Sequence, residues 1–327
     1  MTDHTPLKIL SVLDGKPGHE KQTRGVLNAL SGITPVRIDY RHIPATPSLS
    51  RMGEWLQCLF CYRLGGRIEK KDSNRTGPVD FIIGTGTQTH IYMLLKKKES
   101  RSKVLTCMSP SPFLIKKFDL CFVPQHDNLA PMKNVFLTQG PPNTSPYTEE
   151  KDNKRGLILV GGVDRKSHVW RSDDTLEQIR TILDKEPSKA WTVGTSPRTP
   201  EGMNHMLEEL AGGYSRVDFV RSKDTSSGWI EKQYEENGFV WVTADSISMI
   251  YEPITAGCQV GILPVEWKRK DSKFHRSIAY VLNQGLAISY EQWLRNGSVY
   301  TANKQRLDEA TRCAEEILRR WWPKRLL

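Results

Sequence analysis

Short apolar segments alternate with helical ones along the chain. A buried strand is predicted at Leu7–Leu13, and helical spacing follows over residues 18–30. The same alternation predicts strands at residues 36–40, 79–84, 103–107, 119–123 and 134–137, with a further helix over 88–97. Because strands that alternate with helices are typical of β-α-β units, we expect a parallel sheet in this half of the chain.

The alternation stops at residues 140–155, where three prolines, small polar residues and a charged run indicate a linker. It then resumes, with strands predicted at residues 157–160, 190–193, 216–220, 239–242, 259–263 and 286–288. The pattern therefore predicts an α/β protein with two Rossmann-like, parallel-sheet domains. We place the first domain at 1–140, the linker at 141–155 and the second domain at 156–304.

Residues 305–327 are expected to form a separate amphipathic helix at the end of the chain. Apolar side chains recur there at steps of three and four, from Leu307 to Trp321. We expect the apolar face of this helix to pack back on the first domain.

The charge of the chain narrows its partners. It has 327 residues, of which 47 are basic and 37 acidic, and its formal charge is +10. Such a protein attracts anionic partners: nucleic acid, an anionic membrane surface or phosphorylated small molecules. We expect no nucleic acid, because the sequence has no aromatic RNA-binding motif, zinc finger or helix-turn-helix signature.

No apolar stretch approaches the roughly 18 residues that a membrane span needs, and residues 1–10 do not resemble a signal peptide. We therefore expect a cytoplasmic protein. Of the six cysteines, only Cys58 and Cys61 lie close together in the sequence. Their spacing permits a zinc site, but the lack of a second pair favours buried, reduced thiols. We expect no metal and no cofactor.

The first candidate site is the segment 14–22, DGKPGHEKQ, between a predicted strand and a helix. Open α/β sheets bind ligands at the carboxyl ends of their strands, and exposed amides at a helix start favour an anion. His19 is suited to act there as a general base. Lys16 and Pro17 interrupt any Gly-x-Gly-x-x-Gly fingerprint, so a dinucleotide site is not expected. The alternative is an ordinary turn in which His19 is a solvated capping residue.

Two further segments place glycines after predicted strands. GTGTQTH at residues 84–90 can bind a substrate, or it can be a plain turn with Thr87 as the helix N-cap. Gly161 and Gly162 are followed by basic residues, which suits a diphosphate. The alternative for this pair is a flexible turn.

A fourth segment, GTSPRT at residues 194–199, also follows a predicted strand and precedes a helix. Thr195, Ser196 and Arg198 offer hydroxyls and a guanidinium to a nucleotide or phosphate. The alternative is that these hydroxyls only cap the next helix.

The segment 242–253, VTADSISMIYEP, carries the most specific pattern. A predicted strand ends at Val242, and a helix begins near Asp245. Either Asp245 or Ser246 can cap this helix, and a phosphate would dock on its first turn. Glu252 lies about two turns later, where a carboxylate can accept bonds from ribose hydroxyls. The alternative is an N-capped helix with an exposed Glu252. The candidate binding residues of this segment are Thr243, Asp245, Ser246, Ser248, Met249 and Glu252, and those at 245, 248, 249 and 252 are expected to share one helix face.

In this order, the segments DGKPGHEKQ, GTGTQTH, LILVGG, VGTSPRTP and VTADSISMIYEP resemble the Elm-type mitochondrial-fission family and its bacterial relatives, over essentially the whole chain. That resemblance implies a GT-B glycosyltransferase-like fold, in which two Rossmann-like domains face each other across a cleft. Gly18-His19 and the segment 246–257 are also distantly similar to the glycosyltransferase that adds N-acetylglucosamine to the lipid-linked peptidoglycan precursor. That relative has glycines at places held here by Asp14, Lys16 and Pro17.

These resemblances imply a metal-independent transfer of a sugar from a nucleoside-diphosphate sugar to a cell-envelope or lipid-linked acceptor. The first domain would bind the acceptor with His19 or Asp14 as the catalytic base, and in the second domain Glu252 would hold the ribose. The implied acceptor-binding residues are Gly15, Lys16, Gly18, Gln22 and Thr87. The implied donor-binding residues outside 242–253 are Gly161, Gly162, Thr195, Ser196 and Arg198.

The sequence bears differently on two other functions. A non-catalytic, membrane-associated adaptor on the same fold stays open, because plant members of the resembled family are linked to recruiting fission machinery to a membrane. A nicotinamide-dependent epimerase would need the Gly-x-Gly-x-x-Gly fingerprint that the sequence lacks.

The segment 51–64, RMGEWLQCLFCYRL, is apolar and flanked by basic residues. Such a helix suits an anionic membrane surface, and it favours a peripheral position on the cytoplasmic face of the inner membrane. The alternative is a helix packed into the core of the first domain, or a dimer contact.

Overall fold

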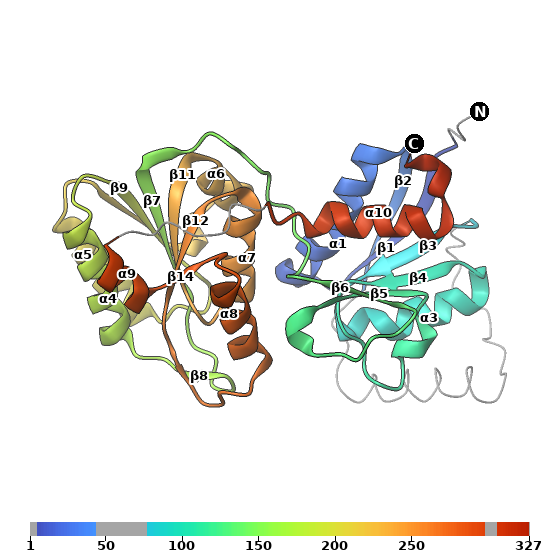
Figure 1. Cartoon of the computed structure of the whole chain (residues 1–327), viewed down its shortest axis with the longest axis horizontal. Helices are drawn as coiled ribbons and strands as arrows, with labels where there is room; N and C mark the ends of the chain where they lie inside the picture. Colours follow the sequence, from blue (N-terminus) through green and yellow to red (C-terminus); the bar gives the residue numbers. More distant parts are fainter. Residues whose placement is uncertain (1–4, 44–76, 298–305, 327) are drawn as a thin grey trace. The chain divides into compact units, whose positions relative to one another are not determined.

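The chain folds into two compact units, each built around one parallel sheet. In a computed structural model that describes residues 5–43, 77–297 and 306–326, the first unit comprises Met1–Thr144 and Asp308–Leu327, and the second Ser145–Leu307 (Figure 1). Each unit contains one six-stranded sheet flanked by helices. The prediction of two Rossmann-like α/β domains is confirmed.

The first sheet has its switch point between its first and third strands. It contains β1 (Leu7–Leu13), β2 (Val36–His42), β3 (Phe81–Gly84), β4 (Lys103–Thr106), β5 (Leu120–Pro124) and β6 (Val135–Thr138). All strand pairs are parallel, in the order β2-β1-β3-β4-β5-β6. Because β2 and β3 lie on opposite sides of β1, the carboxyl ends of β1 and β3 flank the place where open α/β sheets bind ligands.

Helices cover both faces of this sheet. Leu7 and Ile9 of β1 pack in the cluster that includes α1 (Pro17–Ile33) and α10 (Glu309–Trp321), whereas Leu10 and Val12 pack in the cluster that includes α3 (Thr87–Ser100). A strand that is buried on both faces reads as a continuous apolar run, which explains why β1 was visible in the sequence.

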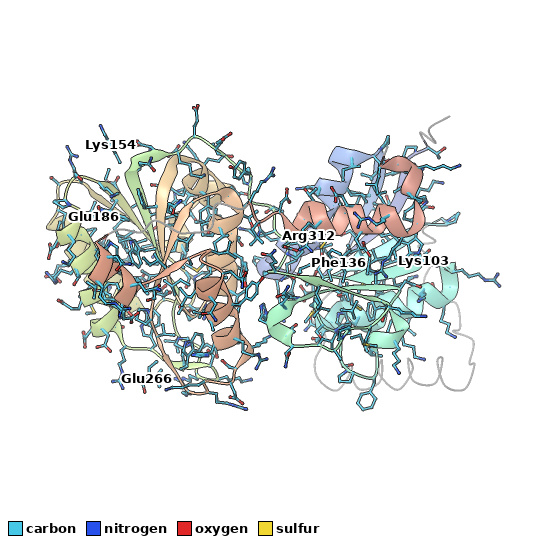
Figure 2. The ribbon with its side chains drawn as sticks, viewed as in Figure 1. Lys103, Phe136, Lys154, Glu186, Glu266 and Arg312 are labelled. Carbon is cyan, nitrogen blue, oxygen red and sulfur yellow. The ribbon has the colours of Figure 1, made fainter. Side chains whose placement is uncertain are left out.

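The last helix, α10, returns to the first unit after the chain has completed the second. Its buried face is formed by Cys313, Ala314, Ile317 and Leu318. The Asp308 side chain caps it by accepting a hydrogen bond from the Thr311 amide at 3.0 Å. The Arg312 guanidinium lies over the ring of Phe136 in β6, 5.1 Å from its centroid, and Figure 2 labels both side chains.

The second sheet repeats the plan of the first. It contains β7 (Asp152–Val160), β9 (Ala190–Thr195), β10 (Val217–Val220), β11 (Asn237–Thr243), β12 (Gln259–Leu263) and β14 (Ile288–Ser289). The strands are parallel in the order β10-β9-β7-β11-β12-β14, so the switch point lies between β7 and β11.

The remaining elements of this unit surround the sheet. Its helices are α4 (Ser172–Lys185), α5 (Glu201–Gly212), α6 (Trp229–Glu236), α7 (Ile247–Ala256), α8 (Lys273–Asn283) and α9 (Tyr290–Asn296). A separate antiparallel ribbon pairs β8 (His168–Val169) with β13 (Glu266–Trp267). A short 3-10 helix of this unit lies at Ser222–Asp224, and those of the first unit lie at Ile115–Lys117, Gln125–Asp127 and Pro323–Arg325.

One boundary differs from the prediction. Strand β7 begins at Asp152, inside the segment 141–155 that was predicted as linker. Its first three residues are exposed and polar, and Asp152 pairs with Asn237 of β11. Strand pairing uses backbone groups and needs no apolar side chains, so the hydrophobic pattern detected only the buried end of the strand.

Candidate functional site

The first candidate site lies at the switch point of the first sheet. Asp14 directly follows β1, and His19 lies in the first turn of α1. His19 Nδ1 is 2.8 Å from Asp14 Oδ2, and the exposed fraction is 0% for the Asp14 side chain and 28% for that of His19. Because an ionised carboxylate can only accept, we assign the proton to Nδ1, which leaves Nε2 as the basic nitrogen. The structure thus joins the two candidate bases into one pair.

The loop between them is closed by carboxylates. The Gly15 amide donates to Glu20 Oε1, and the Lys16 amide donates to Asp14 Oδ1, each at 3.2 Å. Gly15 has a φ of +77°, and Pro17 opens α1, where no amide hydrogen is required. Both loop amides are bonded within the protein and Glu20 adds an acidic side chain to the first turn, so the binding of an anion at this helix start stays a prediction. The loop is better suited to an uncharged hydroxyl group.

The segment 84–90 packs against the Asp14–His19 pair. A Cβ at Gly86, whose φ is +110°, would lie within 3.0 Å of both Asp14 Oδ2 and His19 Nδ1. Next to it, Thr85 Oγ1 and Thr23 Oγ1 share a buried hydrogen bond of 2.8 Å. Gly86 is the N-cap of α3, so the interpretation of Thr87 as N-cap is wrong. Thr87 is exposed, and its role in acceptor binding stays a prediction.

A second histidine lies near this pair. His90 is buried, with its Nε2 3.2 Å from Thr106 Oγ1 and its ring edge against Phe118, 5.1 Å between centroids. Burial, followed by the nearby charge of His19, lowers the pKa of His90 to about 4. His90 therefore stays neutral near pH 7.

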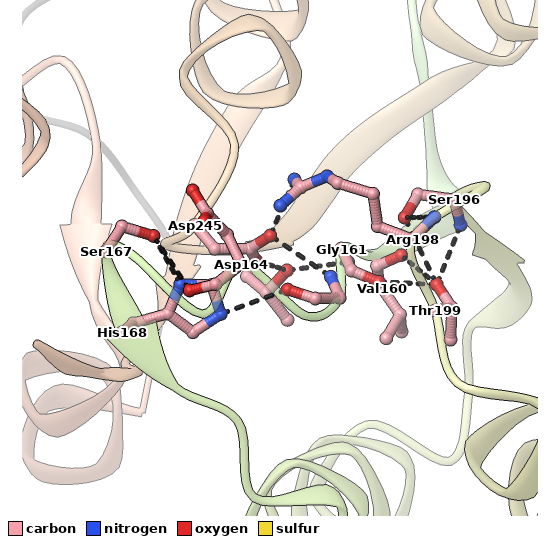
Figure 3. A network of polar contacts seen from close by, with 11 residues as sticks. Val160, Gly161, Asp164, Ser167, His168, Ser196, Arg198, Thr199 and Asp245 are labelled. Atoms are coloured by element: carbon pink, nitrogen blue, oxygen red, sulfur yellow. Dashed lines mark hydrogen bonds and ion pairs between the residues drawn. The ribbon is translucent and has the colours of Figure 1, made fainter.

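The second candidate site lies at the switch point of the other sheet, where Gly161 and Gly162 follow β7 and Asp245 follows β11 (Figure 3). The Asp245 side chain is fully buried, and its Oδ2 accepts from Arg198 Nη2 at 2.7 Å and from the Gly162 amide at 3.1 Å. Asp245 Oδ1 accepts from Thr243 Oγ1 at 2.6 Å, and Thr243 Oγ1 accepts from the Gly161 amide at 2.7 Å. These five predicted residues form one connected network.

The network changes the role of the glycine pair. Both amides donate to side chains of the protein, so they are not available to a diphosphate as predicted. A Cβ at Gly161 would lie within 3.0 Å of both carboxylate oxygens of Asp245, and one at Gly162 would overlap the Arg198 carbonyl. The pair is therefore required for close packing, and the alternative of a flexible turn is also wrong.

Hydroxyl groups fix the loop that carries Arg198. Thr199 Oγ1 donates to the Val160 carbonyl at 3.0 Å and accepts from the Ser196 amide at 2.9 Å. Thr195 Oγ1 accepts from the Ser222 amide at 3.2 Å. Ser196 Oγ accepts from the Arg198 amide at 3.2 Å, so the Thr195 and Ser196 hydroxyls both serve the turn. The Arg198 side chain itself is 39% exposed.

Helix α7 follows this network. Its N-cap is Ser246, whose side chain makes no capping hydrogen bond, and the helix begins at Ile247, so Asp245 neither caps it nor shares its face. Ser248 and Met249 lie half-buried in the first turn, without an acidic side chain. Glu252 is 5% exposed, which contradicts the alternative of an exposed carboxylate.

A known family profile matches the part of the sequence that carries these motifs. Residues 17–321 match the sequence profile described as mitochondrial fission ELM1. The chain belongs to this family. The match covers both units and all predicted site residues except Asp14, Gly15 and Lys16. Among curated proteins, none matches this ELM1-family chain.

Solved structures share the fold of this ELM1-family member at low identity. A Listeria monocytogenes protein assigned as a UDP-N-acetylglucosamine 2-epimerase has a TM-score of 0.59 and 12% identity, covering 96% of this chain and 95% of its own. Staphylococcus aureus MnaA in complex with UDP has a TM-score of 0.56 and 12% identity, covering 98% of each chain. A Neisseria meningitidis UDP-GlcNAc 2-epimerase bound to UDP-GlcNAc has a TM-score of 0.53 and 12% identity, covering 96% of this chain and 99% of its own. The fold is GT-B-like.

Several contacts of the ELM1-family sites were missed in the sequence. His168 Nε2 donates to the Gly162 carbonyl at 3.0 Å, while its Nδ1 is 2.8 Å from Ser167 Oγ. Gly86 was visible only as one glycine of a GTG sequence, and Thr23 looked like an ordinary helix residue. Among the predicted acceptor-binding residues, Gly15 and Lys16 are exposed and Gly18 and Gln22 are half-buried.

Other predictions concern cysteines and membranes. Cys58, Cys61 and the predicted membrane-surface helix 51–64 lie outside the described residues. Cys107, Cys121, Cys258 and Cys313 are buried free thiols. Within 5–43, 77–297 and 306–326, no three His, Cys, Asp or Glu side chains are grouped to hold a metal ion. None of the helices in these ranges has the length and apolar character needed to cross a bilayer.

Proposed function

We propose that this ELM1-family protein is a metal-independent glycosyltransferase that moves a sugar from a nucleoside-diphosphate sugar to an acceptor hydroxyl. The observation that carries the proposal is the Asp14–His19 pair, in which a buried carboxylate orients a half-exposed imidazole at a switch point. A base oriented by a carboxylate is the arrangement that activates a hydroxyl nucleophile. The GT-B-like fold supports the same reaction class.

In the proposed reaction, His19 Nε2 takes the proton of the acceptor hydroxyl as its oxygen bonds to the anomeric carbon of the donor sugar. The bond from that carbon to the diphosphate breaks, and the nucleoside diphosphate leaves with the electron pair. Asp14 stabilises the imidazolium that forms. The residues proposed for the acceptor are Gly15, Lys16, Gly18, Gln22 and Thr87.

The donor is proposed to bind the second unit. The first turn of α7, with half-buried Ser248 and Met249 and no acidic side chain, suits the departing diphosphate. Arg198 contributes a guanidinium whose charge Asp245 partly balances. Glu252 is proposed to accept hydrogen bonds from the ribose. Two of the structures with this fold contain UDP or UDP-GlcNAc, which supports a nucleoside-diphosphate ligand.

A lipid-linked or cell-envelope acceptor, and a peripheral position on the cytoplasmic face of the inner membrane, belong to the same proposal. Charge supports them: the first unit carries 25 basic and 15 acidic residues, whereas the second carries 22 of each. The whole formal charge of +10 therefore resides in the unit that is proposed to bind the acceptor.

The test compares His19→Ala with the native protein in transfer of labelled sugar from a panel of nucleotide sugars to a bacterial lipid extract. Loss of the base should lower turnover about 10²- to 10⁴-fold and leave donor binding unchanged in calorimetry. His205→Ala is the matched control, because His205 is 67% exposed on α5. A His19→Ala protein with the native rate would refute the role of His19.

A second candidate is a nucleotide-sugar 2-epimerase, because the Listeria and Neisseria structures, with TM-scores of 0.59 and 0.53, are named for that activity. The missing Gly-x-Gly-x-x-Gly fingerprint counts only against a nicotinamide-dependent epimerase. Proton NMR of UDP-GlcNAc with enzyme and no acceptor separates the two, since an epimerase inverts the sugar at C2 and a transferase does not. The adaptor alternative expects no binding of any nucleotide sugar.

A further inference from the structure

Two basic segments of the second unit are joined into one surface, here called the basic ribbon and defined as residues 163–171 and 266–276. Strands β8 and β13 pair between them, and the Lys268 amide donates to the Ser167 carbonyl at 3.1 Å. Lys268 Nζ also donates to the Arg165 carbonyl at 2.6 Å. The segments follow β7 and β12, so the ribbon lies beyond the carboxyl edge of the second sheet.

The ribbon concentrates positive charge on a unit that is otherwise acidic. It contains eight basic side chains and three acidic ones, whereas the rest of Ser145–Leu307 has 14 basic and 19 acidic residues. The second unit is neutral overall, so this separation of charge is a feature of one surface. The basic side chains are Arg165, Lys166, Arg171, Lys268, Arg269, Lys270, Lys273 and Arg276, and all eight are exposed.

At least half of these eight side chains lack a carboxylate partner among the described residues. Arg171 pairs with Glu266 at 2.8 Å and Arg269 pairs with Asp271 at 3.1 Å. In the part of the chain that the structure describes, Arg165, Lys166, Lys270 and Lys273 have no carboxylate partner within 4.0 Å. Exposed like charges repel one another, so this arrangement favours an anionic partner.

The form of the surface favours a bilayer over a single phosphate or a nucleic acid. A bound phosphate is held by converging donors, whereas these side chains are spread over two segments and reach into solvent. Nucleic-acid bases stack on free aromatic faces, but Trp267 and Phe274 stack on each other, with centroids 6.3 Å and planes 10° apart. Both rings are half-buried, which leaves the surface mainly electrostatic.

We infer that the basic ribbon docks the second unit on an anionic phospholipid surface. The ribbon is fixed to the candidate donor site, because His168 packs between Trp170 and Trp267 and its Nε2 donates to the Gly162 carbonyl. Docking therefore holds the carboxyl edge of the second sheet close to the headgroups. This inference concerns binding alone and does not depend on glycosyl transfer.

The test is sedimentation of the full chain with vesicles of phosphatidylcholine, with and without phosphatidylglycerol. The native protein should bind only the anionic vesicles, and binding should fall steeply between about 50 mM and about 500 mM salt. The variant Arg165→Gln, Lys166→Gln, Lys270→Gln and Lys273→Gln should bind at least about tenfold more weakly. Exchanging the same four residues between Arg and Lys should preserve binding.

The matched control is Lys154→Gln, Arg180→Gln, Lys185→Gln and Lys232→Gln, which removes the same charge from exposed positions elsewhere in the unit. Figure 2 shows Lys154 at the opposite end of this unit from Glu266 of the ribbon. The control should bind vesicles like the native protein.

Three outcomes would overturn the inference: equal loss in both quadruple variants, native binding by the ribbon variant, or no native binding to anionic vesicles. Binding of single-stranded RNA through the same four residues, without vesicle binding, would identify a nucleic-acid surface instead. Calorimetry with nucleotide sugars is unaffected by any of these results, so the proposed function is tested separately.

Discussion

Gly86→Ala probes the contact between the segment 84–90 and the Asp14–His19 pair. The new Cβ would lie within 3.0 Å of Asp14 Oδ2 and His19 Nδ1, two atoms that are 2.8 Å apart in the hydrogen bond of the pair. One of the two side chains must move, so the bond lengthens or breaks. The φ of +110° adds a backbone cost of about 1–3 kcal/mol for any residue other than glycine.

The expected magnitudes follow from these two effects. Loss of a charged hydrogen bond adds about 1.5–3 kcal/mol, so Gly86→Ala should destabilise the first unit by about 2.5–6 kcal/mol. A base displaced by about 1 Å should lower turnover about 10²-fold, while donor binding stays unchanged. Gly228→Ala is the control, because its φ is +83° and a Cβ there would meet nothing within 4 Å.

The assays are urea unfolding and the ¹⁵N NMR shifts of the His19 ring, which report where its proton lies. Gly228→Ala should show only the backbone cost and a native His19 spectrum. A Gly86→Ala protein with the native His19 tautomer and native turnover would refute the role of Gly86 in positioning the pair.

Two further predictions concern stability. The pKa of His90 is about 4 in the folded protein against an ordinary 6.5, so the stability that neutral His90 contributes is fully present above pH 6.5 and is lost as the pH falls toward 4. Between pH 6.5 and pH 5, His90→Gln should therefore lose about 2 kcal/mol less unfolding free energy than the native protein. Equal pH dependence of the two proteins in urea unfolding would contradict this. Asp245→Ala leaves the Gly162 amide and the Arg198 guanidinium without their acceptor, and it should lower the free energy of unfolding by about 2–4 kcal/mol. This is less than for a fully buried pair, because the Arg198 side chain is 39% exposed. A free energy of unfolding within about 0.5 kcal/mol of the native value, in thermal or urea unfolding, would contradict the prediction.

The sequence predicted the central strands well because they are buried on both faces. Gln259–Leu263 was predicted with the bounds of β12, and β1 likewise. The start of β7 was missed because its polar residues, beginning at Asp152, join the sheet through backbone bonds alone. Hydrophobic patterns detect what a strand buries, and not how far its pairing extends.

The candidate sites were predicted as residues but not as contacts. Asp14 and His19 were both named because they lie in one segment, whereas the contact of Gly86 with both depends on the pairing of β3 with β1. In the second unit, Asp245 was expected to cap a helix. It instead binds Arg198, 47 positions earlier in the chain, and spacing along a sequence carries no signal of such a pairing.

The central claim is that the second unit binds a nucleoside-diphosphate sugar through α7 and Glu252. Calorimetric titration of the native protein with a panel of nucleotide sugars tests it most directly. We predict binding of at least one donor, and about 5- to 150-fold weaker binding by Glu252→Ala, which corresponds to about 1–3 kcal/mol. Glu177→Ala is the control, because Glu177 is 73% exposed on α4, and it should bind like the native protein. Failure of every nucleotide sugar to bind the native protein would contradict the account and favour the adaptor.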